Sequence, residues 1–105
     1  MKGGMRMTSG SYRDYILEQL EGAGEIRCRK MMGEYLLYCD GRLFGGLYDD
    51  RFLVKPIDAA RRLLPDAPEE LPYPGAKPML LVTETDDRAF LAALITEMLP
   101  ELPVR

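Results

Sequence analysis

The residues of this sequence best suited to chemistry are three pairs of neighbouring carboxylates: Asp49-Asp50, Glu69-Glu70 and Asp86-Asp87. Paired carboxylates are candidate ligands for Mg²⁺ or Ca²⁺, which bind oxygen atoms. The chain contains no histidine, so it lacks the commonest general base and metal ligand. The same pairs are also typical of a turn, a loop and a helix N-terminus. We favour these structural interpretations, and predict no catalytic residue, no metal site and no cofactor.

The sulfur-containing residues are interpreted as structural. Cys28 and Cys39 without histidine do not make a typical zinc site. They are close together if their two segments form a hairpin, and we interpret them as buried, reduced thiols rather than as a redox pair. Met31 and Met32 are interpreted as core side chains. The N-terminal segment has no apolar signal region, so we predict a cytoplasmic protein.

Arg29, Lys30, Arg51 and Lys55 form a candidate basic patch. The net charge of −3 and the pI near 5.0 argue against broad binding to phosphate backbones. A solvated surface is therefore the first interpretation of these residues, and direct nucleic-acid binding is the less favoured one. No apolar run approaches the ~18 residues that a membrane helix needs, so we expect no membrane partner.

Turn signals and hydrophobic spacing divide the chain into elements that must position these side chains. We predict a first helix from Ser11 to about Gly22, strands over 26–31, 34–39, 42–48 and 51–55, a short helix over 57–64, an irregular proline-rich loop over 65–78, a strand over 79–83, and a last helix that Asp86-Asp87 open and Pro100 ends. This pattern predicts an α+β, two-layer fold: an antiparallel sheet with helices on one face. Residues 1–10 are expected to be a flexible tail, and residues 11–105 a single domain.

Two-residue turns at Asp40-Gly41 and Asp49-Asp50 fix a strand register that pairs Leu36 with Gly45. One face of the sheet then forms the core, and carries Leu36, Tyr38, Leu43, Leu47, Phe52 and Val54. The opposite face carries Tyr35, Leu37, Phe44, Tyr48 and Leu53. The second face is too apolar for solvent, so we predict that it binds a partner protein or a second copy as a homodimer. A one-residue slip would exchange the two faces.

A family pattern runs through the same strands. It is carried by Arg29, Lys30, Met31, Gly33, Leu37, Tyr38, Asp40, Gly41, Phe44, Asp50, Phe52, Leu53 and Lys55. This pattern resembles the N-terminal domain of the TfoX/Sxy family, which is named for regulating natural competence. The chain departs from it at Met32, Glu34 and Leu36, where the family has Phe, Gly and Gly. The resemblance implies a secretion-chaperone-like order, α-β(3-4)-α-β(2)-α, with residues 71–73 as a further strand.

The resemblance also implies a bacterial protein that acts in transcription regulation by contacting other proteins. We therefore predict a non-enzymatic regulatory domain that binds a partner protein or itself. One alternative is a nucleic-acid-binding accessory protein that uses the basic patch. A further alternative is a small-ligand-binding domain that uses carboxylates and Tyr35, Tyr38 or Tyr73 near the proline-rich loop.

Overall fold

The computed structural model describes residues 7–104, whose elements follow the order helix, four strands, helix, two strands, helix. The elements are α1 (Gly10–Gln19), β1 (Ile26–Met31), β2 (Glu34–Cys39), β3 (Arg42–Leu47), β4 (Phe52–Val54), α2 (Asp58–Leu63), β5 (Glu69–Glu70), β6 (Met79–Leu81), α3 (Arg88–Met98) and the 3-10 helix η1 (Leu99–Glu101). This order confirms the predicted α+β class. Most of the predicted tail, residues 1–6, lies outside the described residues.

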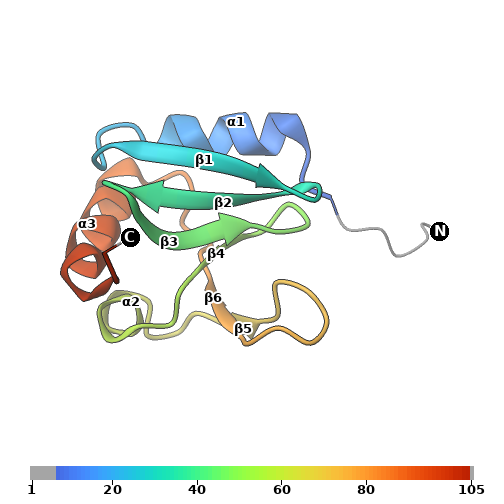
Figure 1. The fold of residues 1–105 in the computed structure, drawn as a ribbon. Helices are drawn as coiled ribbons and strands as arrows, with labels where there is room; N and C mark the ends of the chain where they lie inside the picture. The colour runs from blue at the N-terminus through green and yellow to red at the C-terminus, as the bar shows by residue number, and fades with distance from the viewer. Residues whose placement is uncertain (1–6, 105) are drawn as a thin grey trace.

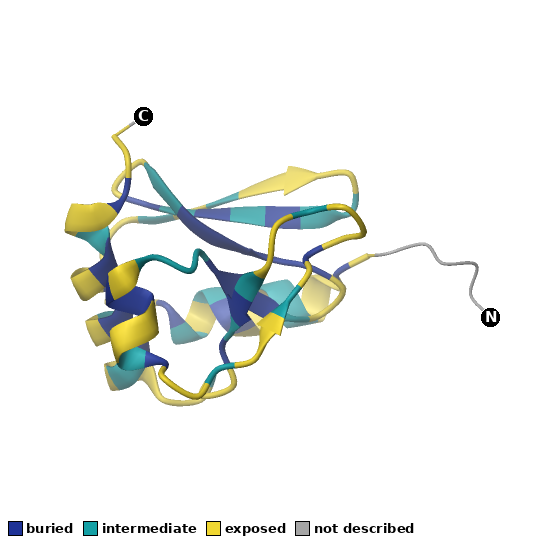
Figure 2. Ribbon diagram, turned by 90° about the horizontal axis from the view of Figure 1, so that it is seen from below, coloured by how far each residue is buried: buried dark blue, intermediate teal, exposed yellow. Residues whose placement is uncertain are grey.

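The six strands form one antiparallel sheet with the order β1-β2-β3-β4-β6-β5 (Figure 1). In Figure 2 the helices lie on one side of the sheet, and their buried side chains belong to the same cluster as those of the strands. The longest helix, α3, has 11 residues. Within residues 7–104, no helix is long and apolar enough to cross a membrane.

Tight turns with positive φ join the first four strands. Met32 and Gly33 connect β1 to β2 with φ of 53° and 85°, and Asp40 and Gly41 connect β2 to β3 with φ of 51° and 80°. Successive positive φ values give the two-residue turn that matches the twist of a hairpin. Asparagine, aspartate and glycine adopt this conformation most readily, so Met32 is an unusual residue for its position.

A β-bulge in β3 decides which side chains of the meander face the helices. Tyr38 lies opposite Leu43, as predicted for the turn at residues 40–41. Two residues further from that turn, however, Gly45 lies opposite Leu37 instead of Leu36. Phe44 is therefore an extra residue in β3, opposite no residue of β2. Because side chains alternate along a strand, this extra residue places the side chains of β2 on the opposite face of the sheet from the one predicted.

The predicted face assignment is consequently wrong in β2 and at the start of β3. Leu36 pairs with Gly46, and the three residues expected in the core are only partly buried: Leu36, Tyr38 and Leu43. Three residues expected on the opposite face are buried in the core instead: Tyr35, Leu37 and Phe44. The turn at residues 49–50 sets the pairing of β3 with β4 as predicted, and the remaining expected core residues are confirmed: Leu47, Phe52 and Val54.

The helices supply the other half of this core. The fully buried helical residues are Ile16 and Leu20 near the end of α1, Ala59 and Ala60 in α2, and Leu91, Leu94, Ile95 and Met98 in α3. Burying one of these leucine, isoleucine or methionine side chains stabilises the fold by about 1.5–3 kcal/mol. The helices therefore bury the inner face of the sheet, and leave the outer face without a helical layer.

The first helix begins at Gly10, one residue earlier than Ser11. Ser9 is its N-cap, and the Ser9 Oγ accepts a hydrogen bond from the Tyr12 backbone N–H at 3.1 Å. The preceding Thr8 is buried, and its backbone N–H donates to the Gly33 carbonyl at 2.9 Å. Thr8 is thus attached to the β1–β2 turn.

The two C-terminal strands of the sheet, β5 and β6, are short. β5 consists of Glu69 and Glu70, which pair with β6. The further strand that the family resemblance placed at residues 71–73 is wrong, because that segment is turn and coil. The strand expected over 79–83 ends at Leu81.

Candidate functional site

The face of the sheet that no described helix covers is the candidate functional surface. We call it the helix-free face, and its sheet residues are Leu36, Tyr38, Leu43, Tyr48 and Leu53. Of the residues predicted to bind a partner, Tyr48 and Leu53 lie on this face, and both are buried. Tyr35, Leu37 and Phe44 belong to the core on the other side. The partly exposed apolar side chains of the helix-free face are Leu36, Tyr38 and Leu43.

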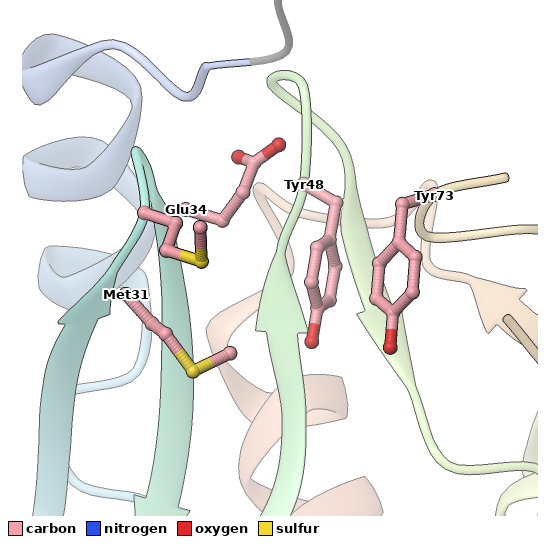
Figure 3. A pocket seen from close by; sticks show the side chains of 5 residues that line it. Met31, Glu34, Tyr48 and Tyr73 are labelled. Carbon is pink, nitrogen blue, oxygen red and sulfur yellow. The ribbon is translucent and has the colours of Figure 1, made fainter.

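A pocket of about 330 Å³ lies at the hairpin end of the helix-free face. We call it the tyrosine pocket; it is lined by Met31, Met32, Glu34, Tyr48 and Tyr73. Figure 3 shows Met31 and Glu34 projecting from the β1–β2 hairpin, and the two tyrosine rings side by side opposite them. The ring centroids of the tyrosines are 6.3 Å apart and their planes meet at 54°.

Local structure explains why the β1–β2 hairpin contributes three of these side chains. Met31 and Glu34 are the pair that flanks the turn at residues 32–33. Met31 is 46% exposed and Met32 is 93% exposed. The interpretation of these methionines as core residues is therefore wrong. The turn holds the Met32 side chain out in solvent beside the pocket.

Glu34 is fixed in the pocket by the chain on both sides of it. Its Oε1 accepts hydrogen bonds from the Thr8 hydroxyl at 2.7 Å and from the Asp49 backbone N–H at 3.1 Å. These contacts join three segments: the N-terminal segment, the β1–β2 hairpin and the β3–β4 turn. The carboxylate is only partly buried, and its Oε2 accepts no hydrogen bond from the described residues.

Arg51 positions Tyr73, which comes from the proline-rich loop. Its guanidinium donates to the Tyr48 carbonyl at 3.0 Å, to the Pro72 carbonyl at 3.3 Å and to the Glu70 carboxylate at 2.9 Å. These bonds hold the loop that contains Tyr73 against the end of β3. Arg51 is therefore a structural link between the two tyrosines.

The electrostatic surroundings of Tyr48 keep its phenol protonated. Burial raises the pKa of Tyr48 above its ordinary value, and the neighbouring Tyr73, Glu34 and Tyr38 raise it further. The pocket therefore combines apolar walls with one carboxylate, that of Glu34.

The predicted basic patch is divided between distant strands. Arg29 and Lys30 are exposed on β1, whereas Arg51 and Lys55 flank β4. Two strands separate β1 from β4, which places them about 14 Å apart. The Arg51 guanidinium is also paired with Glu70. The structure does not bring these four residues together into one cationic site.

The remaining candidates for chemistry have structural roles. Asp49 and Asp50 form the β3–β4 turn, each with positive φ. Asp87 caps α3 through a hydrogen bond from the Phe90 backbone N–H at 3.0 Å, as its predicted position implied. The pair Glu69-Glu70, expected in a loop, forms β5. No group of three or more potential metal ligands occurs among residues 7–104.

Cys39 is buried as predicted, whereas Cys28 is only partly buried. Cys28 and Cys39 are both free; Cys39 lies opposite Ile26, and Cys28 lies opposite Leu37. Burial raises the pKa of each thiol. A raised pKa disfavours the thiolate that disulfide chemistry needs.

Sequence reasoning missed the pocket because its parts meet only in the folded chain. In the sequence, Tyr73 falls in an irregular loop and is named only for the small-ligand alternative, and Glu34 stands out only as a departure from a family pattern. The available signal was the Met31-Met32-Gly33 sequence. Glycine after an apolar pair indicates a turn at this point, and a turn exposes at least one of the two methionines.

Comparison with known proteins identifies the family. A family model described as the TfoX N-terminal domain matches residues 18–93. An uncharacterized 12.7 kDa protein in the trpE 5′ region of Spirochaeta aurantia is 40% identical over 70 residues, which is 67% of this chain and 61% of that protein. The chain therefore spans less than two thirds of that relative. No solved structure matches. Because the family model covers most of the chain, the chain belongs to the TfoX N-terminal domain family.

Proposed function

We propose that this domain is a regulatory module of the cytoplasm that binds a partner protein through its helix-free face and catalyses no reaction. The observation that carries the proposal is the apolar surface on that face. Leu36, Tyr38 and Leu43 are partly exposed on neighbouring strands, and Met32 and Tyr73 are 93% and 51% exposed beside them. An apolar surface assembled from sheet and loop residues is typical of a protein interface.

The charge of the surface supports a protein partner rather than a nucleic acid. The basic residues are split between β1 and β4, and Arg51 is neutralised by Glu70. The net charge of the chain is −3. Recognition of a phosphate backbone depends on clustered Lys and Arg, and the four candidate basic residues do not form one cluster.

The test places a photocrosslinking amino acid at Tyr38 and, as the control, at Thr96 on the exposed side of α3. We expect discrete crosslinked products in the native host from position 38 and not from position 96. The purified protein is then measured by light scattering over a concentration series. Crosslinks between copies together with a dimer would identify the partner as a second copy.

A matched pair of variants checks that the face itself is responsible. Leu43→Asp places a charge on the helix-free face, and Thr96→Asp places the same charge on α3. We expect Leu43→Asp alone to abolish the crosslinks, with both variants folded by circular dichroism. Equal crosslinking from positions 38 and 96, or no product from either with a monomer at every concentration, would show that the proposed function is wrong.

A further inference from the structure

We propose that the tyrosine pocket binds the positively charged side chain of a lysine or arginine from the partner protein. This inference rests on the proposed function for the existence of that partner, and it adds the chemistry of the contact. It starts from the composition of the pocket: two aromatic rings, two thioethers and one carboxylate. Among its described lining residues, Glu34 is the one with a formal charge.

The tyrosine rings are suited to an organic cation. The face of an aromatic ring is electron-rich and attracts a guanidinium or ammonium group that lies within about 6 Å of its centre. The Tyr73 ring is 51% exposed and lies against the buried Tyr48 ring, with centroids 6.3 Å apart, so Tyr73 is the ring that is accessible to a ligand (Figure 3). The same fold already contains such a contact, because the Arg13 guanidinium lies 5.2 Å from the centroid of the Tyr35 ring.

Glu34 supplies the charge that complements this ligand. Its Oε1 is held by Thr8 and Asp49, so the carboxylate does not need to reorganise when a ligand arrives. Its Oε2 is the atom without a hydrogen bond from the described residues, and carboxylate oxygens form strong charge-assisted bonds with guanidinium or ammonium groups. Arg51 donates a hydrogen bond to the Tyr48 carbonyl, and its guanidinium is already paired with Glu70.

The conformation and exposure of Met32 support a binding role for the rim of the pocket. Its φ of 53° is unfavourable for a methionine, and its side chain is 93% exposed. Backbone strain and exposure of a large apolar side chain both oppose stability, and strain of this kind is concentrated at functional sites. A flexible thioether adapts to the aliphatic stem of a lysine or arginine.

The size and position of the pocket select a protein side chain as the occupant. A volume of about 330 Å³ is at the lower end of the range for small-molecule sites. The pocket is also continuous with the helix-free face, because Tyr48 lines the pocket and belongs to that face. A partner that covers this face therefore brings its own side chains to the pocket.

The first test uses the full chain with methyl-labelled methionine and follows the Met31 and Met32 signals by NMR. Butylguanidinium is titrated against butylurea, which has nearly the same shape and no charge. We expect butylguanidinium to bind at least about fivefold more tightly, as one cation–π contact of roughly 1 kcal/mol implies. The Met98 signal, from the core of α3, serves as an internal control and should not shift.

Three variants make the test specific. Glu34→Gln preserves the acceptor for Thr8 and Asp49 but removes the charge, so it should reduce the preference for the cation. Tyr73→Leu should weaken binding of butylguanidinium more than that of butylurea. Arg29 lies on β1 opposite Leu36, on the same face, and is exposed. Arg29→Gln removes a repelling charge, and should strengthen binding of the cation.

The outcomes separate this inference from the proposed function. Equal affinity for the two compounds, or an unchanged preference in Glu34→Gln, would overturn the cation site even if position 38 crosslinks to a protein. A clear preference for the cation combined with no crosslinked protein would assign the pocket to a free organic cation, and would overturn its assignment to a partner side chain. A preference for the cation together with crosslinks that Glu34→Gln weakens would support the inference.

Discussion

Phe44 and Phe52 pack edge to face in the core, with ring centroids 6.5 Å apart and ring planes at 76°. This contact exists because Phe44 is the extra residue of the β-bulge, which turns its ring toward the helices. Aromatic pairs in this arrangement contribute about 0.5–1.5 kcal/mol beyond the area that they bury. Simple alternation along the strand predicts that Phe44 lies on the outer face. The bulge places it in the core instead.

The register predicts a contrast between two neighbouring residues. Phe44→Ala should lower the free energy of unfolding by about 3–5 kcal/mol, the usual effect of truncating a buried phenylalanine. Leu43→Ala should have a much smaller effect, because Leu43 is only partly buried on the helix-free face. Urea denaturation of both variants measures the difference. A larger loss for Leu43→Ala would contradict the bulged register.

Gly46 has no room for a side chain. A Cβ at this position would lie 2.7 Å from the Tyr35 carbonyl oxygen and 2.7 Å from Cε2 of Tyr48. We expect Gly46→Ala to destabilise the protein by about 1–3 kcal/mol and to displace the Tyr48 ring. Thermal unfolding and tyrosine fluorescence report these two effects. Gly10→Ala in α1 is the control, since its Cβ meets nothing closer than 3.5 Å, and it should be neutral or stabilising.

Relieving the strain at Met32 should stabilise the fold. Asparagine tolerates positive φ better than methionine, so Met32→Asn should raise the free energy of unfolding by about 1 kcal/mol. Asp40→Asn is the matched control, because Asp40 occupies the equivalent turn position with φ of 51° and already tolerates it. Chemical denaturation measures both. An unchanged free energy of unfolding in Met32→Asn would refute the strain that we assign to this turn.

Stability should decrease at alkaline pH, in part through Tyr48. Its pKa in the folded protein is raised above 10.0, first by burial. Above the ordinary pKa of tyrosine, the unfolded chain loses this proton while the folded protein retains it, so rising pH favours unfolding. Tyr48→Phe should therefore reduce the stability lost between about pH 8 and pH 11, where tyrosine titrates. Urea unfolding at both pH values tests this, and an identical loss in the two proteins would count against it.

Much of the fold follows from local signals in the sequence. Asp40-Gly41 marks a hairpin turn that the structure contains, Pro56 follows the end of β4, and Pro100 lies in the 3-10 helix that follows α3. The bulge at Phe44 leaves no comparable signal, because an added residue in one strand changes no composition and no turn. Gly45, beside it, is the sole hint in that strand: a Cβ there would collide with the Leu53 carbonyl oxygen.

The candidate site was less predictable than the fold because its geometry depends on tertiary contacts. Arg51 is a basic residue in the sequence, yet in the structure its charge is used to hold the proline-rich loop. Glu34 acquires its position from Thr8, which is 26 residues away along the chain. Spacing within one segment cannot reveal contacts of this kind.

The strand order also sets how quickly different parts of the chain find one another. β1 to β4 pair with their neighbours in sequence across turns of a few residues, so little chain entropy is lost when each hairpin closes. The pairing of Leu53 with Leu81 encloses residues 54–80, and must close a far longer loop. We expect the meander to form early in folding and β6 to join late. Pulse-labelled hydrogen exchange should then protect the amides of β2 and β3 before those of β6, so that the tyrosine pocket, which needs the loop before β6, is completed last.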